Sequence, residues 1–295
     1  LREILAHQAG LNPYIVFLSE VLKKDKSLKS RFIKKNAKKR FASQAYDNIF
    51  VKDRFKNKMY RQINRSKVSD VKKYRYSGLT FLLYPKIISD ITSKKYTEYL
   101  QEHFYRPLGA TTLGFTPKNK NFTNKIVPTE IDSLFRKDLT KNWVHDENAA
   151  LMGGISGNAG LFGSALDLAT IMQMYANYGY YNFKQYISKS TLKEFTKIQY
   201  PENDNRRGLG FDKPLIGNDT LPINKAYPAP EVSAESFGHA GFTGTFVWAD
   251  PKHHLVFIFL SNRVYPSRSH RNIYNLNVRP KVQQVFYQAN KKSKN

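Results

Sequence analysis

In the stretch SFGHAGFTGTFVWADP, residues 236–251, His239 lies among small residues and is followed by an apolar run. A second apolar run, LVFIFLSN, follows after the short link PKHH. Two apolar runs joined in this way predict an antiparallel hairpin that is buried on both faces, with both strands central in a sheet. We therefore expect His239 to stand at the mouth of a buried strand.

Outside this stretch the sequence predicts mainly helices. Residues 79–108 carry apolar side chains at helical spacing and predict two consecutive helices. Pro85 should kink the first of these helices or delay its start. Ser164 predicts the N-cap of a helix over 165–178, and residues 277–292 predict a last helix. Residues 111–145 suggest an extended connection. Helices in the middle and strands at the end predict an α+β fold.

The composition limits the class of protein. A chain of 295 residues with 41% hydrophobic and 14% aromatic residues can build a globular core. Cysteine is absent, which excludes disulfide bonds and thiolate chemistry. No apolar run reaches about 18 residues, so we expect no transmembrane segment. The first residues do not read as a signal peptide, and Leu1 is expected to be a cut end because the chain does not begin with methionine.

The positive charge is unevenly distributed. The net charge is +25, and residues 21–75 hold 20 Lys and Arg against 4 Asp and Glu. Aromatic residues recur among these cations at spacings that suit burial, so we interpret the segment as a basic helical insert with a solvated face. The alternative is a surface for an anionic partner: nucleic acid, a lipid surface or an acidic polymer. Nucleic acid is disfavoured because no nucleic-acid motif accompanies the charge.

His239 and the residues after it suit acyl-transfer chemistry. An oxyanion site needs backbone N–H groups that no side chain obstructs, and Gly241 would leave the strand edge open to a substrate. The N–H of Phe242 could point at the oxyanion, and His239 could transfer a proton nearby. Spacing alone leaves another interpretation equally open, in which His239 sits in a turn that merely leads into a strand.

Tyr76, within YRYSG at 74–78, is a second candidate. Neighbouring positive charge lowers the pKa of a phenol and would stabilise its phenolate. The local sequence favours the structural alternative, an aromatic side chain that anchors the start of a helix.

Two Ser-x-x-Lys pairs, Ser69/Lys72 and Ser190/Lys193, have the spacing of a serine nucleophile activated by lysine. Neither lies in an apolar helix that would bury the lysine, so we expect neither to be catalytic. The seven histidines are scattered, so we expect no metal site. The glycine-rich residues 148–163 lack the ending of a phosphate loop, and we expect no cofactor.

Taken together, five segments resemble the serine β-lactamase and penicillin-binding-protein-like family, in the family's order: LREILAHQAGL (1–11), YRYSGLTFLL (74–83), FYRPLGATTLGF (104–115), GNAGLFGSALDLATIMQM (157–174) and FGHAGFTGT (237–245). The last resembles the His-Thr-Gly version of the third family motif, as in class C-like members. Four more segments are similar to a subgroup in which this domain follows a family 3 glycoside hydrolase (β-N-acetylglucosaminidase-like) domain in a cell-envelope protein: QAGLNPYIVF, IVPTEIDSLFR, VHDENAALMGG and LSNRVYPS.

The resemblance implies one β-lactamase/transpeptidase-like domain over residues 1–295, a sandwich in which helices flank an antiparallel sheet. It implies acyl transfer through a serine ester, with peptidoglycan-type amides or esters as substrates, in the periplasm or cell envelope. By position, Tyr76 would move protons and His239 would orient substrate or assist proton transfer. The N–H of Phe242, next to Gly241, would be one oxyanion donor.

Two departures from the family pattern qualify this implication. Gly78 stands where the family carries Asn, or Asp in the similar subgroup, so a polar contact is lost. The family's Ser-x-x-Lys would precede residue 1, so we expect a domain without its N-terminal part, inactive as the chain stands. The expected function is the C-terminal portion of a serine hydrolase. The alternative is a non-catalytic member that binds cell-wall glycan or peptide.

Overall fold

The computed structural model describes residues 1–119 and 126–292. Its strands are β1 (Ile33–Lys34), β2 (Ser43–Tyr46), β3 (Ile49–Val51), β4 (Glu130–Asp132), β5 (Asp138–Thr140), β6 (Tyr180–Tyr181), β7 (Lys184–Gln185), β8 (Phe237–Ala240), β9 (Phe246–Asp250) and β10 (Leu255–Phe259). Its α-helices are α1 (Arg2–Leu5), α2 (Leu18–Val21), α3 (Phe55–Asn64), α4 (Tyr84–Thr92), α5 (Tyr96–Leu100), α6 (Glu147–Leu151), α7 (Ala165–Ala176), α8 (Lys189–Thr196), α9 (Asn272–Asn275) and α10 (Val278–Lys292).

The main sheet is antiparallel, with the order β10-β9-β8. The predicted hairpin is confirmed as β9 and β10, with Phe257 opposite Trp248. The expectation that both its strands are central was wrong for β10, which is an edge strand of this sheet. Its sequence is as apolar as that of a central strand because helices cover the sheet on both faces.

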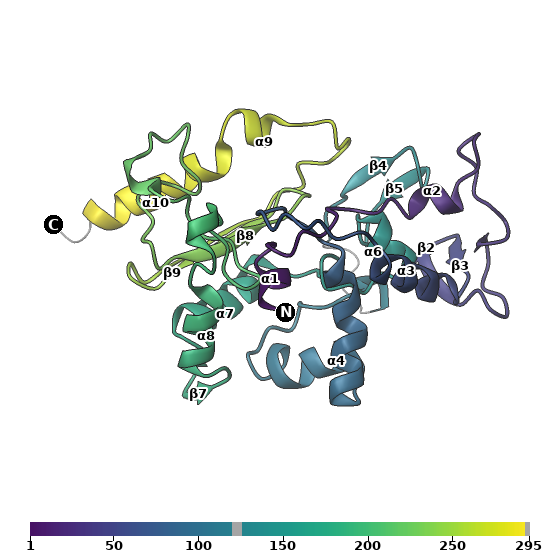
Figure 1. Cartoon of the computed structure of the whole chain (residues 1–295), viewed down its shortest axis with the longest axis horizontal. Coiled ribbons are helices and arrows are strands. Elements are labelled where there is room, and N and C mark those ends of the chain that lie inside the picture. The colour runs from purple at the N-terminus through teal and green to yellow at the C-terminus, as the bar shows by residue number, and fades with distance from the viewer. Residues whose placement is uncertain (120–125, 293–295) are drawn as a thin grey trace.

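The side chains of β9 alternate between two apolar clusters. Phe246 and Trp248 pack on one face with Tyr287 of α10, whereas Ala249 packs on the other face with Met172 of α7. This alternation is the two-residue period of a strand. Figure 1 shows α10 and α7 on opposite sides of the strands, which confirms the expected α+β sandwich.

Most of the predicted helices are confirmed. Pro85 lies in the first turn of α4, as a late start requires, and α5 continues into a short π-helical segment. The Oγ of Ser164 accepts a hydrogen bond from the N–H of Asp167 at 3.2 Å and caps α7. The connection over 111–145 contains the β4–β5 hairpin, and its residues 120–125 lie outside the described residues. No described helix is long and apolar enough to cross a membrane.

Residues 21–75 do not form the helical insert that the sequence predicts. They contain the small antiparallel sheet β1-β3-β2 and one helix of more than a single turn, α3. Strands of two to four residues are too short to show a two-residue period, so the aromatic spacing does not distinguish them from a helix. In the structure Phe32 and Phe55 pack with ring centroids 5.3 Å apart. The strands and α3 of this segment lie at the end of the molecule opposite α10 (Figure 1).

Candidate active site

Tyr76 lies between a buried histidine and a buried arginine. The ring of His7 is 4.3 Å from the Tyr76 ring, centroid to centroid, and the guanidinium carbon of Arg207 is 5.2 Å from the same ring. His7 Nδ1 accepts a hydrogen bond from the N–H of Ser77 at 3.3 Å, which fixes the segment that carries Tyr76. Tyr76 as a whole is still 46% exposed.

The structure brings His239 close to Tyr76, with ring centroids 6.2 Å apart. His239 lies in β8, and its Nδ1 donates to the carbonyl oxygen of Ala240 at 2.9 Å. Nε2 is therefore the hydrogen-bond acceptor of the neutral ring. Burial and then the charge of Arg207 lower the pKa of His239 below its ordinary value of 6.5, so the ring is neutral at pH 7.

Three charged residues that the sequence analysis did not single out lie next to these two side chains. Arg206 binds both carboxylate oxygens of Asp212, at 2.9 and 3.1 Å, and Arg207 Nε lies 3.7 Å from the same carboxylate. Burial favours the neutral carboxyl, but the two guanidinium groups outweigh it and hold the pKa of Asp212 below its ordinary value. Asp212 pairs with Gly238 of β8 through two backbone hydrogen bonds, which brings both arginines to the strand that carries His239. Their only sequence signal is an Arg-Arg pair before GLGFD.

This cluster carries one net positive charge, because two arginines face one ionised aspartate. His7 adds none: burial, and then the charge of Arg207, lower its pKa from 6.5 to about 3. Arg207 is only 5% exposed, and its Nη1 has no hydrogen-bond partner among the described residues. A buried guanidinium with an unused donor favours an anionic group beside Tyr76.

The sequence-based expectation for the pKa of Tyr76 was wrong in direction. Arg207 does favour the phenolate, but burial has the larger effect and raises the pKa of Tyr76 above 10.0. The phenol therefore keeps its proton at pH 7. It is suited to relaying a proton rather than to acting as a standing base.

The peptide between Gly241 and Phe242 is held in place just beyond β8. The Gly241 carbonyl accepts a hydrogen bond from Arg279 at 3.0 Å, and because the Phe242 N–H shares its peptide plane, this bond also sets the direction of that N–H. Arg263 Nε donates to the Phe242 carbonyl at 2.9 Å. A Cβ at Gly241 would stand 2.2 Å from Thr245 Oγ1, so the close turn favours glycine. Among the described residues the Phe242 N–H has no acceptor.

Gly78 has a polar neighbour that the sequence analysis missed. A Cβ at Gly78 would lie 3.7 Å from Asn158 Nδ2, an ordinary van der Waals distance. Asn158 belongs to the glycine-rich stretch 148–163, and its Oδ1 accepts a hydrogen bond from Ser156 at 2.5 Å. An amide from another segment therefore stands beside the position where the family carries Asn.

Neither Ser-x-x-Lys pair lies in a buried helix. Ser69 and Lys72 are in an exposed irregular segment, where Lys72 pairs with Glu3 at 2.8 Å. Ser190 and Lys193 are on the exposed face of α8. Neither lysine is therefore buried beside its serine.

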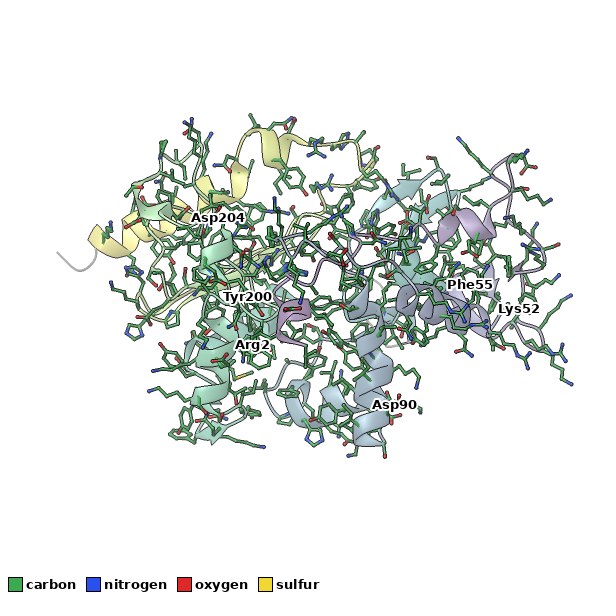
Figure 2. All side chains as sticks on the ribbon, in the orientation of Figure 1. Arg2, Lys52, Phe55, Asp90, Tyr200 and Asp204 are labelled. Atoms are coloured by element: carbon green, nitrogen blue, oxygen red, sulfur yellow. The ribbon has the colours of Figure 1, made fainter. Side chains whose placement is uncertain are left out.

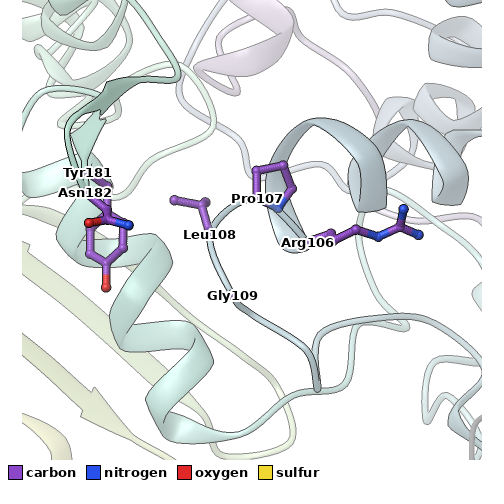
Figure 3. Close-up of a pocket in the computed structure, with 6 residues that line it drawn as sticks. All are labelled: Arg106, Pro107, Leu108, Gly109, Tyr181 and Asn182. Atoms are coloured by element: carbon purple, nitrogen blue, oxygen red, sulfur yellow. The ribbon is translucent and has the colours of Figure 1, made fainter.

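A separate surface hollow of about 660 Å³ lies between two other parts of the chain. It is lined by residues 106–109, which follow the π-helical segment after α5, and by Tyr181 and Asn182 at the β6–β7 turn (Figure 3). No candidate site residue lines it, so it does not belong to the Tyr76–His239 site.

Comparison with known proteins connects this geometry to a family. Residues 1–279 match the family model described as Beta-lactamase. A protein of Escherichia coli O157:H7 named "Putative D-alanyl-D-alanine carboxypeptidase" is 35% identical over 203 residues, 65% of this chain and 45% of that protein. A protein of the same name from Salmonella gallinarum (strain 287/91 / NCTC 13346) is 33% identical over 222 residues, 71% of this chain and 49% of that protein. The chain thus spans about half the length of the curated relatives it matches.

Solved structures share the fold. A penicillin-binding protein homolog from Caulobacter crescentus aligns with a TM-score of 0.52 and 16% identity, covering 88% of this chain and 64% of that one. Simvastatin synthase from Aspergillus terreus aligns with a TM-score of 0.52 and 14% identity, covering 96% and 68%. On the family match over residues 1–279, this chain belongs to the β-lactamase family, with the β-lactamase/transpeptidase-like fold.

Proposed function

We propose that this chain supplies the tyrosine and the oxyanion edge of a serine hydrolase that works through an acyl-enzyme. The observation that carries the proposal is the meeting of Tyr76 and His239, with ring centroids 6.2 Å apart, from segments far apart in sequence. Family membership supports the serine ester as the intermediate. The FGHAGFTGT stretch supports a class C-like member of the family.

In the proposed reaction a serine oxygen attacks the scissile carbonyl carbon. Tyr76 accepts the serine proton on its oxygen and passes its own proton to the leaving group, a relay that needs a neutral phenol. The N–H of Phe242 stabilises the oxyanion, and the unprotonated Nε2 of His239 accepts a hydrogen bond that orients Tyr76 or the substrate. Water then hydrolyses the ester and restores the serine. We assign no serine of this chain to that role.

The proposed substrates are peptidoglycan-type amides or esters, with preference for a leaving group that carries a carboxylate. The uncompensated charge of the Arg206–Asp212–Arg207 cluster supports an anionic group beside Tyr76. The relatives named as D-alanyl-D-alanine carboxypeptidases support the same class of substrate.

We further propose that the protein works in the periplasm or cell envelope, where such peptides occur. Four segments are similar to the subgroup in which this domain follows a family 3 glycoside hydrolase domain. They support a fusion with a β-N-acetylglucosaminidase-like domain in the same polypeptide. Peptide mapping of the native protein tests this directly: peptides of a glycosidase domain are expected, and a native mass of 34.2 kDa would overturn the fusion.

The function is tested with the native protein and a peptide ending in D-Ala-D-Ala, beside the same peptide with an amidated end. We expect release of D-Ala from the peptide that ends in a free carboxylate. Cleavage of the peptide with the amidated end should be much slower. Tyr76→Phe should lower kcat by about 100-fold or more, because the proton relay is lost. Tyr180→Phe, at an exposed tyrosine of β6, is the matched control and should leave kcat unchanged. Equal rates for the two variants would contradict the role of Tyr76.

A non-catalytic member that binds cell-wall glycan or peptide is the second candidate. Gly78, in place of the family's Asn, and the position of both Ser-x-x-Lys pairs favour it. This candidate predicts peptide binding without turnover, with the same affinity in the native protein and in its Tyr76→Phe variant.

A further inference from the structure

We propose that residues 21–65, the basic lobe, form a docking surface for a linear phosphate polymer, which they recognise by charge alone. The lobe holds 16 Lys and Arg and 3 acidic residues in 45 positions, whereas the other 250 positions hold 32 Lys and Arg and 20 acidic residues. A chain that was merely rich in lysine would spread its charge evenly. The excess is therefore a property of this part of the fold.

The acidic residues of the basic lobe do little to neutralise its cations. Asp25 and Asp53 accept hydrogen bonds from backbone N–H groups of neighbouring loops. Asp47 forms an ion pair with Lys118, which lies outside the lobe. Among the described residues, the lobe cation with a carboxylate partner is Lys58, which pairs with a glutamate of α2. The remaining charge is available to a ligand.

The exposed cations of the lobe are Lys23, Lys24, Lys26, Arg31, Lys35, Lys38, Lys39, Arg40, Arg54, Arg61 and Arg65. They belong to the same segment as Lys52 and Phe55, which Figure 2 labels at one end of the molecule. The core beneath them is apolar, since Phe55, Met59 and Ile63 of α3 are buried. The fold therefore turns the apolar side chains inward and presents charge outward.

The lobe presents charge without exposed apolar surface. All of residues 21–65 are described, and none of their large hydrophobic side chains is exposed. The lobe's own cations lie over its aromatic rings, with Arg31 4.5 Å from the Phe32 centroid and Lys56 5.8 Å from that of Tyr60. Stable anchoring on a lipid bilayer combines charge with a second, apolar group, and binding of single-stranded nucleic acid combines charge with open rings on which bases stack. Neither is offered.

A phosphate polymer fits this surface. The basic lobe has 11 lysines and 5 arginines. Lysine carries a compact charge on a flexible stem and can follow phosphates at variable spacing, whereas the planar fork of arginine is suited to fixed bidentate contacts. Such binding releases counterions and weakens steeply with salt.

The surface continues toward the Tyr76 site. Residues 66–76 connect the lobe to it and expose Lys67, Lys73 and Arg75 beside Val68 and Val71. A hollow of about 340 Å³ on this segment is lined in part by Lys73 and Arg75. A polymer on the lobe would extend along this segment. The docking surface stands on its own charge and does not depend on the proposed hydrolase function.

The test uses the 295-residue chain and fluorescently labelled inorganic polyphosphate, with affinity measured by anisotropy between 50 and 200 mM salt. One variant reverses four exposed lobe charges: Lys24→Glu, Lys35→Glu, Lys38→Glu and Lys39→Glu. The matched control makes the same change in net charge at exposed lysines elsewhere: Lys184→Glu, Lys189→Glu, Lys225→Glu and Lys252→Glu. Circular dichroism and thermal melting establish that each protein is folded.

The lobe variant should bind about 100-fold more weakly at 50 mM salt, and its log–log salt slope should be about 3 smaller. The control variant should bind within a few-fold of the unmodified chain. Equal losses in the two variants would overturn the proposal, because net charge and not the lobe would then be the cause. Two further results would overturn it: tighter binding to a single-stranded polynucleotide of equal charge, and binding to phosphatidylglycerol vesicles that polyphosphate cannot displace.

Discussion

Protonation of His7 should destabilise the fold by an amount that the structure specifies. In the unfolded chain His7 binds a proton below about pH 6.5, whereas in the folded protein it does so only near pH 3. The unfolded state therefore binds more protons between these values, and the free energy of unfolding falls as the pH is lowered through this window. Each pH unit corresponds to about 1.4 kcal/mol, so the loss between pH 7 and pH 5 is about 2 kcal/mol.

The assay is urea unfolding at pH 7 and pH 5, followed by the fluorescence of the two buried tryptophans, Trp143 and Trp248. His7→Asn isolates the effect, because the asparagine Oδ1 can take the place of Nδ1 as acceptor for the Ser77 N–H but does not titrate. The unmodified chain should lose about 2 kcal/mol more than the variant over this interval. Equal losses would refute the assignment of His7 as a buried neutral residue that supports the Tyr76 segment.

Further predictions concern single side chains and the chain as a whole. Ser164→Ala should lower the free energy of unfolding by about 1 kcal/mol through loss of the α7 cap. Trp248→Ala should cost about 3–5 kcal/mol because its ring is fully buried between the sheet and α10. Gly244→Ala should cost about 2 kcal/mol or more, since φ is +123° and the new Cβ would stand 2.8 Å from the Ser261 carbonyl oxygen. Urea unfolding measures all three, and a change under 0.5 kcal/mol would contradict the contact concerned. Any loss of activity of the native protein through protonation of His239 should have its midpoint below pH 6.5, because burial lowers the pKa of this residue. A decline with a midpoint at or above pH 6.5 would contradict this. The 295-residue chain alone should not hydrolyse a chromogenic β-lactam or ester, and turnover would refute the view that its serines lack the catalytic arrangement.

The elements that the sequence predicted correctly are those whose signals are local. The strands β9 and β10 are apolar because helices cover both faces of the sheet. The Ser164–Asp167 pair forms the N-cap of α7 by itself. Pro85 sets the start of α4 because its ring suits the first turn of a helix. Each of these signals needs only a few neighbouring residues. The family resemblance likewise rested on short segments such as FGHAGFTGT.

The features that the sequence did not predict depend on residues far apart in the chain. His7 and Arg207 flank Tyr76 from positions 69 residues before it and 131 residues after it. The pKa of Tyr76 rises because burial, which no local pattern reports, outweighs the charge of Arg207. The short strands of residues 21–75 carry too few side chains to reveal a period, so the sequence does not distinguish this small sheet from helix.

The proposed acyl-enzyme is tested most directly by the intact mass of the protein from its native source, with and without a serine-reactive acylating probe. We predict a mass above 34.2 kDa that increases by one adduct on a serine, and slower formation of this adduct in the Tyr76→Phe variant. A native protein that takes up no adduct would contradict the serine-hydrolase function and leave the peptide- or glycan-binding role in its place.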